Sequence, residues 1–416
     1  MHDRLNDGGA PARPRLLVIS PWENVWSLAD AGGVKAGVSD DDRFIDGFTR
    51  AGYELHFLRP QGPHDDPRVV THTYPNFFRS TAGYPTAARR LLWPSLFNIN
   101  VVPRALSLAR SLAPVVVMGH SHYSTPATWW CRRVTGIPSV VKLFGVMDLV
   151  HTEWSATRYY AKNIEQLAAL KYPQDAWIVL DDGTRGGDIL RARGLPSERV
   201  HFLPNGMDLE WMDRKEDRAQ ARARFKLPLD AKVVLFLARL VDSKRPQDAI
   251  AAFARVAGIS PGAHLVVAGD GHLRGACERA VNEAALSGRV SFAGVLPHDD
   301  IPVLMAACDV FVSTSTLTNR ALPTCEAMMC GVPVVVYDTG DTATVVRHNE
   351  SGLLAHDGDV DALARGIEQL FADAELRTRL AEGARAVARG FSPWSKRIAM
   401  ELAIIQALAQ RKRATG

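Results

Sequence analysis

The chain has 416 residues, of which 47% are hydrophobic and 23% are charged, and its formal net charge is +4. This length exceeds one typical core and fits two domains of roughly 200 residues each. The small charge is spread along the chain and predicts no nucleic-acid partner. No apolar run reaches the ~18 residues of a transmembrane segment. The five cysteines form no CxxC pair and no metal-ligand spacing, which favours reduced thiols in a cytoplasmic protein.

Residues 1–14 are polar, and we expect them to be disordered. The apolar run at 15–20 then predicts a buried strand. A glycine-rich loop follows, with Gly32 and Gly33 at its centre, and three acids at 40–42 open a helix whose dipole they complement. Such a loop between strand and helix occurs in doubly wound folds with and without a ligand.

Residues 71–110 mix aromatic with basic side chains. The members of this mixture are Tyr74, Phe77, Phe78, Trp93, Phe97, Arg79, Arg89, Arg90 and Arg104. One interpretation is a segment that lies on a membrane surface or binds a lipid-linked acceptor. The other, which we favour, is an insertion in an acceptor-binding domain with some exposed aromatic side chains. A peripheral membrane location therefore stays open.

Two histidines follow a strand predicted at 115–118. His120 and His122 lie at its carboxyl end, where open α/β sheets bind ligands. The His-x-His spacing also occurs in metal sites, but no Cys or carboxylate accompanies it here, so we predict no metal. A further strand is predicted at 175–182, and the alternation of strands and helices indicates a parallel doubly wound sheet.

The second half repeats this pattern. Predicted strands cover 232–238, 264–269, 290–294, 310–312 and 332–336, and residues 212–230 are predicted to be helical. Gly269 and Gly294 end two of the strands. Arg239 and Lys244 follow the first strand as two cations that could lower the energy of charge on phosphate oxygens. They could equally be ordinary surface charges.

The chain is organised around residues 313–340. A polar loop at 316–321 leads from a strand into a helix that Leu322, Pro323 and Thr324 open and that Gly331 ends. The start of this helix would attract an anion such as a diphosphate, with Glu326 one turn inside. An α/β repeat that binds no ligand is the alternative.

The run LPTCEAMMCGVPVV at 322–335 resembles retaining glycosyltransferases of family 4. In that family a Glu-x7-Glu signature ends in Glu-Ala-Met-Ala-Cys-Gly-x-Pro-Val. The second Glu of the signature matches Glu326. The first Glu falls on Thr318, and Asn319-Arg320-Ala321 replaces Gly-Phe-Gly. The nucleotide half of the signature is therefore present, and the sugar half is altered.

Other segments carry the same resemblance. PNGMD at 204–208 is similar to the linker between the family's two domains, and His122-Tyr123 is similar to its His-x-His-aromatic motif. Arg239 and Lys244 match the two cations of its Gly-Arg-Leu-x-x-x-Lys-Gly run. Where the family has a Thr-x-His-Gly end, however, residues 142–145 read KLFG and the His is missing.

The resemblance implies the GT-B fold class, an α/β architecture with two Rossmann-like doubly wound domains that face a central cleft. Residues 1–203, joined by a C-terminal helix at 392–416, would bind the acceptor. Residues 204–391 would bind the donor, a nucleotide diphosphate sugar. No separate cofactor and no metal is implied.

The resemblance also implies roles for individual residues. Arg239 and Lys244 would stabilise the leaving diphosphate, Glu326 would hold the ribose, and His122 would contact the donor sugar or its phosphate. The remaining donor contacts that we expect are Gly32, Gly33, Gly269, Gly294, Thr318, Asn319, Arg320, Ala321, Leu322, Pro323 and Thr324.

The implied reaction is the retaining transfer of a sugar, of the hexosyltransferase type, to an acceptor hydroxyl. A hydroxyl at position 318 cannot supply the negative charge of a Glu beside a developing oxocarbenium ion. Asn319 and Arg320 would then fit an unusual deoxy-, amino- or charged sugar. The alternatives are a nucleotide-sugar binding protein without transfer activity, an epimerase or a phosphorylase. For the acceptor, a small secondary metabolite is favoured over a lipid-linked or cell-wall precursor.

Overall fold

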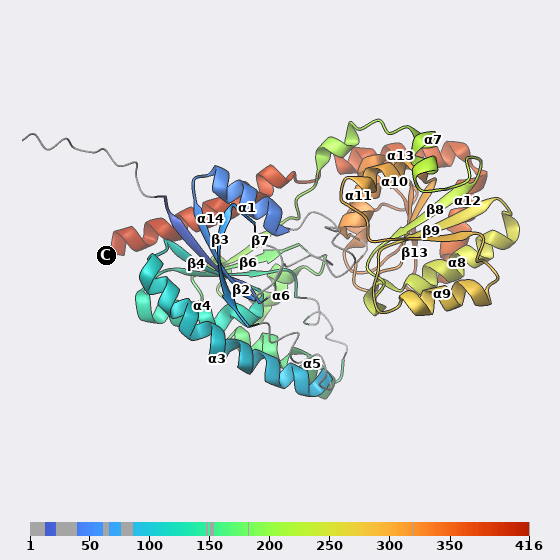
Figure 1. Cartoon of the computed structure of the whole chain (residues 1–416). Helices are drawn as coiled ribbons and strands as arrows, with labels where there is room; N and C mark the ends of the chain where they lie inside the picture. The colour runs from blue at the N-terminus through green and yellow to red at the C-terminus, as the bar shows by residue number, and fades with distance from the viewer. Residues whose placement is uncertain are drawn as a thin grey trace, which may run out of the picture.

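The computed structural model describes residues 13–21, 40–60, 66–75, 86–146, 149, 154–181, 183–318 and 320–415. These residues form two α/β domains, each built on one parallel sheet with helices on both faces (Figure 1). The predicted pair of doubly wound domains is confirmed.

The first domain holds a seven-stranded sheet in the order β3-β2-β1-β4-β5-β6-β7. Its strands are β1 (Arg15–Ile19), β2 (Glu54–Pro60), β3 (Val69–Tyr74), β4 (Val116–His120), β5 (Ser139–Leu143), β6 (Ala176–Leu180) and β7 (Val200–Leu203). Its helices are α1 (Asp40–Arg50), α3 (Thr86–Leu112), α4 (Thr125–Thr135), α5 (Ala156–Ala169) and α6 (Gly186–Ala192). Every residue of β4, β5 and β6 is buried, as expected for a parallel sheet covered on both faces.

The second domain holds a six-stranded sheet in the order β10-β9-β8-β11-β12-β13. Its strands are β8 (Lys232–Leu237), β9 (Ala263–Ala268), β10 (Val290–Gly294), β11 (Val310–Ser313), β12 (Val334–Tyr337) and β13 (Leu353–Ala355). Its helices are α7 (Arg218–Arg224), α8 (Pro246–Ile259), α9 (Arg274–Glu283), α10 (Asp300–Ala307), α11 (Leu322–Cys330), α12 (Val360–Ala372) and α13 (Ala374–Ala388). Both sheets reverse strand order beside their first strand, the place where such sheets bind ligands.

The last helix, α14 (Trp394–Thr415), returns to the first domain and lies along α1 (Figure 1). Its Ile398 and Ile405 join the core around Phe44 and Phe48. The chain therefore crosses between the domains twice, once through the linker after β7 and once before α14.

A buried ion cluster fixes α14 to the sheet. Lys142 of β5 lies 2.9 Å from Glu401 (Nζ to Oε1), and Arg397 also pairs with Glu401. All three side chains are fully buried. The Lys142 ammonium also lies 5.0 Å from the centre of the Phe44 ring. The cluster thus joins α14, β5 and α1.

One expectation about the extent of a helix is wrong. Helix covers only Arg218–Arg224 of the range 212–230, because the Asp217 carboxylate caps α7 by accepting from the backbone N–H of Gln220 and the helix ends before Pro228. In the range 71–110, Tyr74 and Phe97 are buried against each other. Phe77, Phe78 and Arg79 lie outside the described residues. Within the described ranges, no helix is long and apolar enough to span a bilayer.

Candidate functional site

The loops after β8 and β9 touch at a point where only glycine fits. Gly269 has φ +118°, and a Cβ there would lie 2.0 Å from the carbonyl oxygen of Ala238. Its N–H donates to the carbonyl of Gly294 over 2.6 Å. The predicted donor glycines Gly269 and Gly294 therefore meet beside Arg239, the residue after Ala238.

The predicted cations differ in surroundings. The Arg239 side chain is exposed. Lys244 donates to the hydroxyl of Ser315 over 3.3 Å, and its carbonyl accepts from the hydroxyl of Thr314 over 2.7 Å. These contacts bring Lys244 against the exit of β11, next to the polar loop at 316–321.

That loop ends at the N-terminus of α11. Ala321 is extended and precedes the helix, Pro323 occupies its first turn, and Gly331 ends it in the left-handed conformation. The predicted bounds of this helix are confirmed. The positive end of the α11 dipole consequently lies beside the loop that Lys244 contacts.

Glu326 lines a small cavity of about 70 Å³ with Leu322, Asp208, His298 and Trp394. Burial raises the pKa of Glu326 to about 7, although His298 opposes the shift. The carboxyl group is therefore close to half-ionised at neutral pH, unlike an exposed Glu.

Asp208 of the linker joins four segments of the chain. It accepts from His298 over 2.9 Å and from the indole N–H of Trp394 over 3.2 Å, and it pairs with Arg43 of α1. Burial alone would raise the pKa of Asp208, but these partners outweigh burial and hold it below the usual value. Asp208 is thus an ionised carboxylate that contacts α1 of the first domain, the loop before α10 of the second domain and the start of α14.

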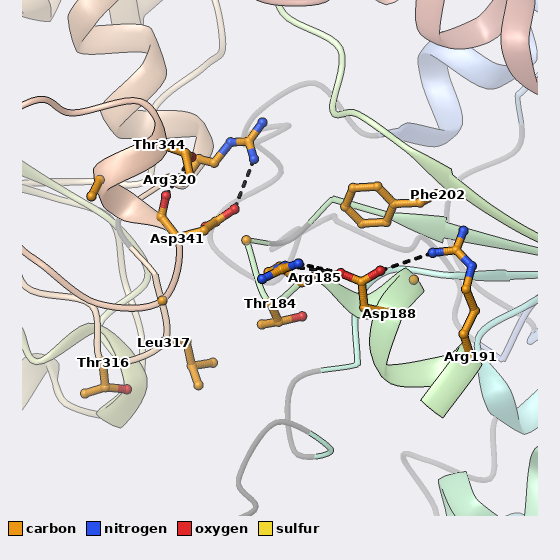
Figure 2. Close-up of a pocket in the computed structure, with 14 residues that line it drawn as sticks. Thr184, Arg185, Asp188, Arg191, Phe202, Thr316, Leu317, Arg320, Asp341 and Thr344 are labelled. Carbon is orange, nitrogen blue, oxygen red and sulfur yellow. Dashed lines mark hydrogen bonds and ion pairs between the residues drawn. The ribbon is translucent and has the colours of Figure 1, made fainter. Parts of the chain in front are cut away.

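A larger cavity of about 860 Å³ lies between the domains (Figure 2). One wall comes from the segment after β6 through the start of β7, and the other from the loops after β11 and β12. The residues that line it are Gly183, Thr184, Arg185, Gly187, Asp188, Arg191, Phe202, Thr316, Leu317, Arg320, Gly340, Asp341, Ala343 and Thr344.

Arg320 bridges the two domains at this cavity. Its guanidinium lies 3.0 Å from Asp181, which follows β6, and 3.0 Å from Asp341, which follows β12. Burial would lower the pKa of Arg320, but the two carboxylates outweigh burial and raise it. Arg320 is therefore already neutralised by protein carboxylates.

Thr318 lies under this bridge and is buried. Its hydroxyl donates to Asp341 Oδ1 over 3.0 Å and accepts from the backbone N–H of Arg320 over 3.0 Å. Across the domain boundary, Gly183 has φ +80°, and a Cβ there would lie 2.4 Å from the Thr318 methyl group. Thr318 thus fills the contact between the domains and is not among the residues that line the cavity.

The two histidines after β4 have different surroundings. The strand continues through His120, so this ring lies in the core, edge-on to Phe44, Phe57 and Phe144, and the expectation that it faces a ligand is wrong. Ser121 then has φ +64°, a strained conformation for a residue with a side chain.

Past this kink, the His122 ring lies 4.0 Å from the ring of Tyr123. Burial lowers the pKa of His122 to about 4, so its imidazole is neutral at physiological pH. His122 lines neither of the two cavities.

The structure divides the predicted site residues into groups. Arg320 lies at the large cavity, and Glu326 with Leu322 lies at the small one. Gly32, Gly33 and Asn319 lie outside the described residues. Among the residues that the structure describes, no group of three or more His, Cys, Asp or Glu side chains is arranged to hold a metal ion.

The sequence analysis assigned no site role to three acids: Asp181, Asp208 and Asp341. Asp181 lies at the end of the strand predicted at 175–182, and Asp208 belongs to the linker motif. These positions were the signals that could have pointed to the two acids as site residues. Their partners, however, come from distant segments of the chain. No local pattern pairs Asp181 with Arg320, because the two residues lie in different domains.

Two glycosyltransferase families match the chain, one in each domain. Residues 42–211 match Glycosyltransferase Family 4, and residues 217–387 match Glycosyl transferases group 1. The chain is 30% identical to the D-inositol 3-phosphate glycosyltransferase of Salinispora tropica over 310 residues, which cover 67% of this chain and 61% of that protein. It is 35% identical to the 2-deoxystreptamine glucosyltransferase of Streptomyces kanamyceticus over 198 residues, 44% of this chain and 49% of that protein. The chain thus spans less than two thirds of either relative.

Among solved structures, the fold is similar to that of Anabaena HepE in complex with UDP-glucose. The TM-score is 0.69 at 18% identity, with 93% of this chain and 99% of that chain covered. At this identity the likeness concerns the fold. Together with the two family matches, it shows two glycosyltransferase-like domains, the first similar to Glycosyltransferase Family 4 and the second to Glycosyl transferases group 1, in a GT-B type fold.

Proposed function

We propose that this chain of two glycosyltransferase-type domains transfers a sugar from a nucleotide diphosphate sugar to an acceptor hydroxyl, with retention at the anomeric carbon. One observation carries the proposal: a single loop joins a cation for the diphosphate, a cavity for the sugar and a helix N-terminus for the phosphate charge. Ser315 accepts from Lys244, Thr316 and Leu317 line the interdomain cavity, and Ala321 precedes the N-terminus of α11. A diphosphate held at α11 and Lys244 would present its sugar to the cavity.

The chemistry of this arrangement is electrostatic. When the bond between the sugar carbon and the diphosphate oxygen breaks, the electron pair leaves with the oxygen, and Lys244, Arg239 and the α11 dipole stabilise the charge. The acceptor oxygen bonds to the sugar carbon on the face that the diphosphate leaves, and its proton passes to the diphosphate. Glu326 would accept the ribose hydroxyls, and His122, neutral at physiological pH, would contact the sugar or its phosphate.

The names of the relatives supply the first acceptors to test. One relative is a D-inositol 3-phosphate glycosyltransferase and another is a 2-deoxystreptamine glucosyltransferase. Both names denote small polyhydroxylated acceptors, so these two compounds are the first acceptors to test.

The test incubates the protein with a panel of nucleotide diphosphate sugars, with and without these two acceptors, and measures binding and nucleotide release. We expect one donor to bind and to release its nucleotide slowly in water and faster with an acceptor, giving a product whose anomeric configuration equals that of the donor. Lys244→Ala should reduce release by about 100-fold. The exposed Lys215→Ala serves as its control. Binding without release under any mixture would instead indicate a nucleotide-sugar binding protein.

A further inference from the structure

We propose that Asp341 supplies the carboxylate of the donor-sugar subsite, in place of an acid at position 318. This inference rests on the proposed glycosyl transfer and names a residue that determines how the sugar is held. Asp341 belongs to the loop after β12, outside the signature segment at 318–326.

Position 318 cannot fill this role itself. Thr318 is 3% exposed, and both hydrogen-bonding functions of its hydroxyl are taken, one by Asp341 and one by the backbone of Arg320. Its methyl group occupies the contact with Gly183. A longer acidic side chain at this position would have to displace the loop after β6.

Asp341, in contrast, reaches the cavity and is held in one orientation. It lines the 860 Å³ space, and its Oδ2 is bound to Arg320 over 3.0 Å (Figure 2). Its Oδ1 accepts from the Thr318 hydroxyl over 3.0 Å. The other carboxylate that lines the cavity, Asp188, lies on the opposite wall and pairs with Arg185 and Arg191. Asp341 is therefore the lining acid on the same wall as the loop that leads into α11.

The charge of the cluster also favours this role. Arg320 is shared between Asp341 and Asp181, so with both carboxylates ionised the three side chains carry one net negative charge. Positive charge develops on the sugar ring as its bond to the diphosphate breaks. A fixed negative cluster beside the ring lowers the energy of that state more than it lowers the energy of the intact donor.

The test compares charged and neutral side chains of equal size at one position. The variants Asp341→Glu, Asp341→Gln and Asp341→Asn are measured for turnover of the donor that the panel identifies, for UDP affinity and for thermal midpoint. Asp341→Gln and Asp341→Asn should turn over about 100-fold more slowly than the wild type, and Asp341→Glu should keep at least a tenth of its rate. The affinity for UDP, which lacks the transferred sugar, should stay within about threefold because Asp341 faces that sugar.

The double variant Thr318→Asp/Asp341→Asn places the carboxylate at position 318 instead of position 341. Because position 318 is buried and does not line the cavity, we expect this variant to regain less than threefold over Asp341→Asn. The control is Asp309→Asn, because Asp309 also pairs with two arginines, Arg218 and Arg222, but lies at the opposite end of β11. Its loss should lower the thermal midpoint without lowering turnover.

The outcomes separate the two proposals. A wild-type protein that turns over no donor overturns the proposed function. An active wild type with equal rates for Asp341→Glu and Asp341→Gln overturns the role of Asp341 alone. That role also falls if UDP affinity and turnover decline together in Asp341→Gln, or if the double variant regains the wild-type rate.

Discussion

Glu326 shows how a single buried residue couples pH to both stability and binding. Its pKa in the folded protein is about 7, above the ordinary value of 4.5. The folded state therefore holds the proton between these two values more often than the unfolded chain does. The contribution of Glu326 to stability is full below about pH 4.5 and is lost as the pH rises through about 7. An acid kept at such a position is typical of a functional site.

We predict that the nucleotide diphosphate sugar identified by the donor panel binds more tightly to the wild type as the pH rises from about 6 to about 8, because an ionised Glu326 would accept the ribose hydroxyls more strongly. Glu326→Gln should remove this dependence and weaken binding about tenfold at the upper pH. A nucleotide diphosphate sugar suits the calorimetric titration since its phosphates do not titrate in this range. Glu278→Gln, which changes an exposed acid paired with Arg274, is the control. A flat wild-type profile would contradict the assignment.

The sequence could predict the position of Glu326 one turn inside a helix, but it could not predict the partners of Thr318. Glu326 lies in a helix whose start and end are marked locally by Pro323 and Gly331, so a short window was sufficient. The Asp341–Arg320–Asp181 bridge joins loops that are distant in the chain. Its existence depends on how closely the two domains approach, which no local pattern encodes.

Among the elements, the buried strands were the most predictable because runs such as VVLF and LVV have no polar alternation. The length of α7 could not be predicted, because a charged segment has no apolar stripe that marks where a helix begins and ends. The position of α14 was implied by the family resemblance alone. What holds it there, the pairing of Glu401 with Lys142 of β5, depends on residues that are far apart in sequence.

We predict that Glu401→Gln lowers the free energy of unfolding of the first domain by about 3–5 kcal/mol, since it removes the buried carboxylate with which Lys142 and Arg397 pair. Urea unfolding, followed by hydrogen exchange in β5 and α1, would measure the change. The control is Asp361→Asn, which removes an exposed pair with Arg255 and should cost less than about 1 kcal/mol. A loss as small as the control's would show that hydrophobic contacts alone hold α14.

At the scale of the molecule, charged side chains join the domains at two separate places. Asp208 pairs with Arg43 of α1 near the linker, and Arg320 pairs with Asp181 at the large cavity. The Arg43–Asp208 pair lies where the chain crosses between the domains. A rotation of the domains about this crossing would therefore leave the pair intact. The Arg320–Asp181 pair spans the cavity and must break before the cavity walls can separate.

We predict that Arg320→Gln opens the cavity, because Asp181 and Asp341 would then face each other without a cation. Hydrogen exchange at 183–192 and 316–321 should accelerate about tenfold or more, and small-angle scattering should show a larger radius of gyration. Arg245→Gln removes pairs with Asp248 and Asp357 inside the second domain and is the control. Unchanged exchange in Arg320→Gln would mean that other contacts keep the domains closed.

The return of α14 has a consequence for the order in which the protein can mature on the ribosome. β7 ends at Leu203 and α14 begins at Trp394, so roughly 190 residues separate the sheet of the first domain from the helix that completes its core. At ordinary rates of translation this is a delay of roughly 10 to 40 s. During that interval Phe44 and Phe48 lack their contacts with Ile398 and Ile405. The core of the first domain can therefore be completed only after the chain of the second domain has been synthesised.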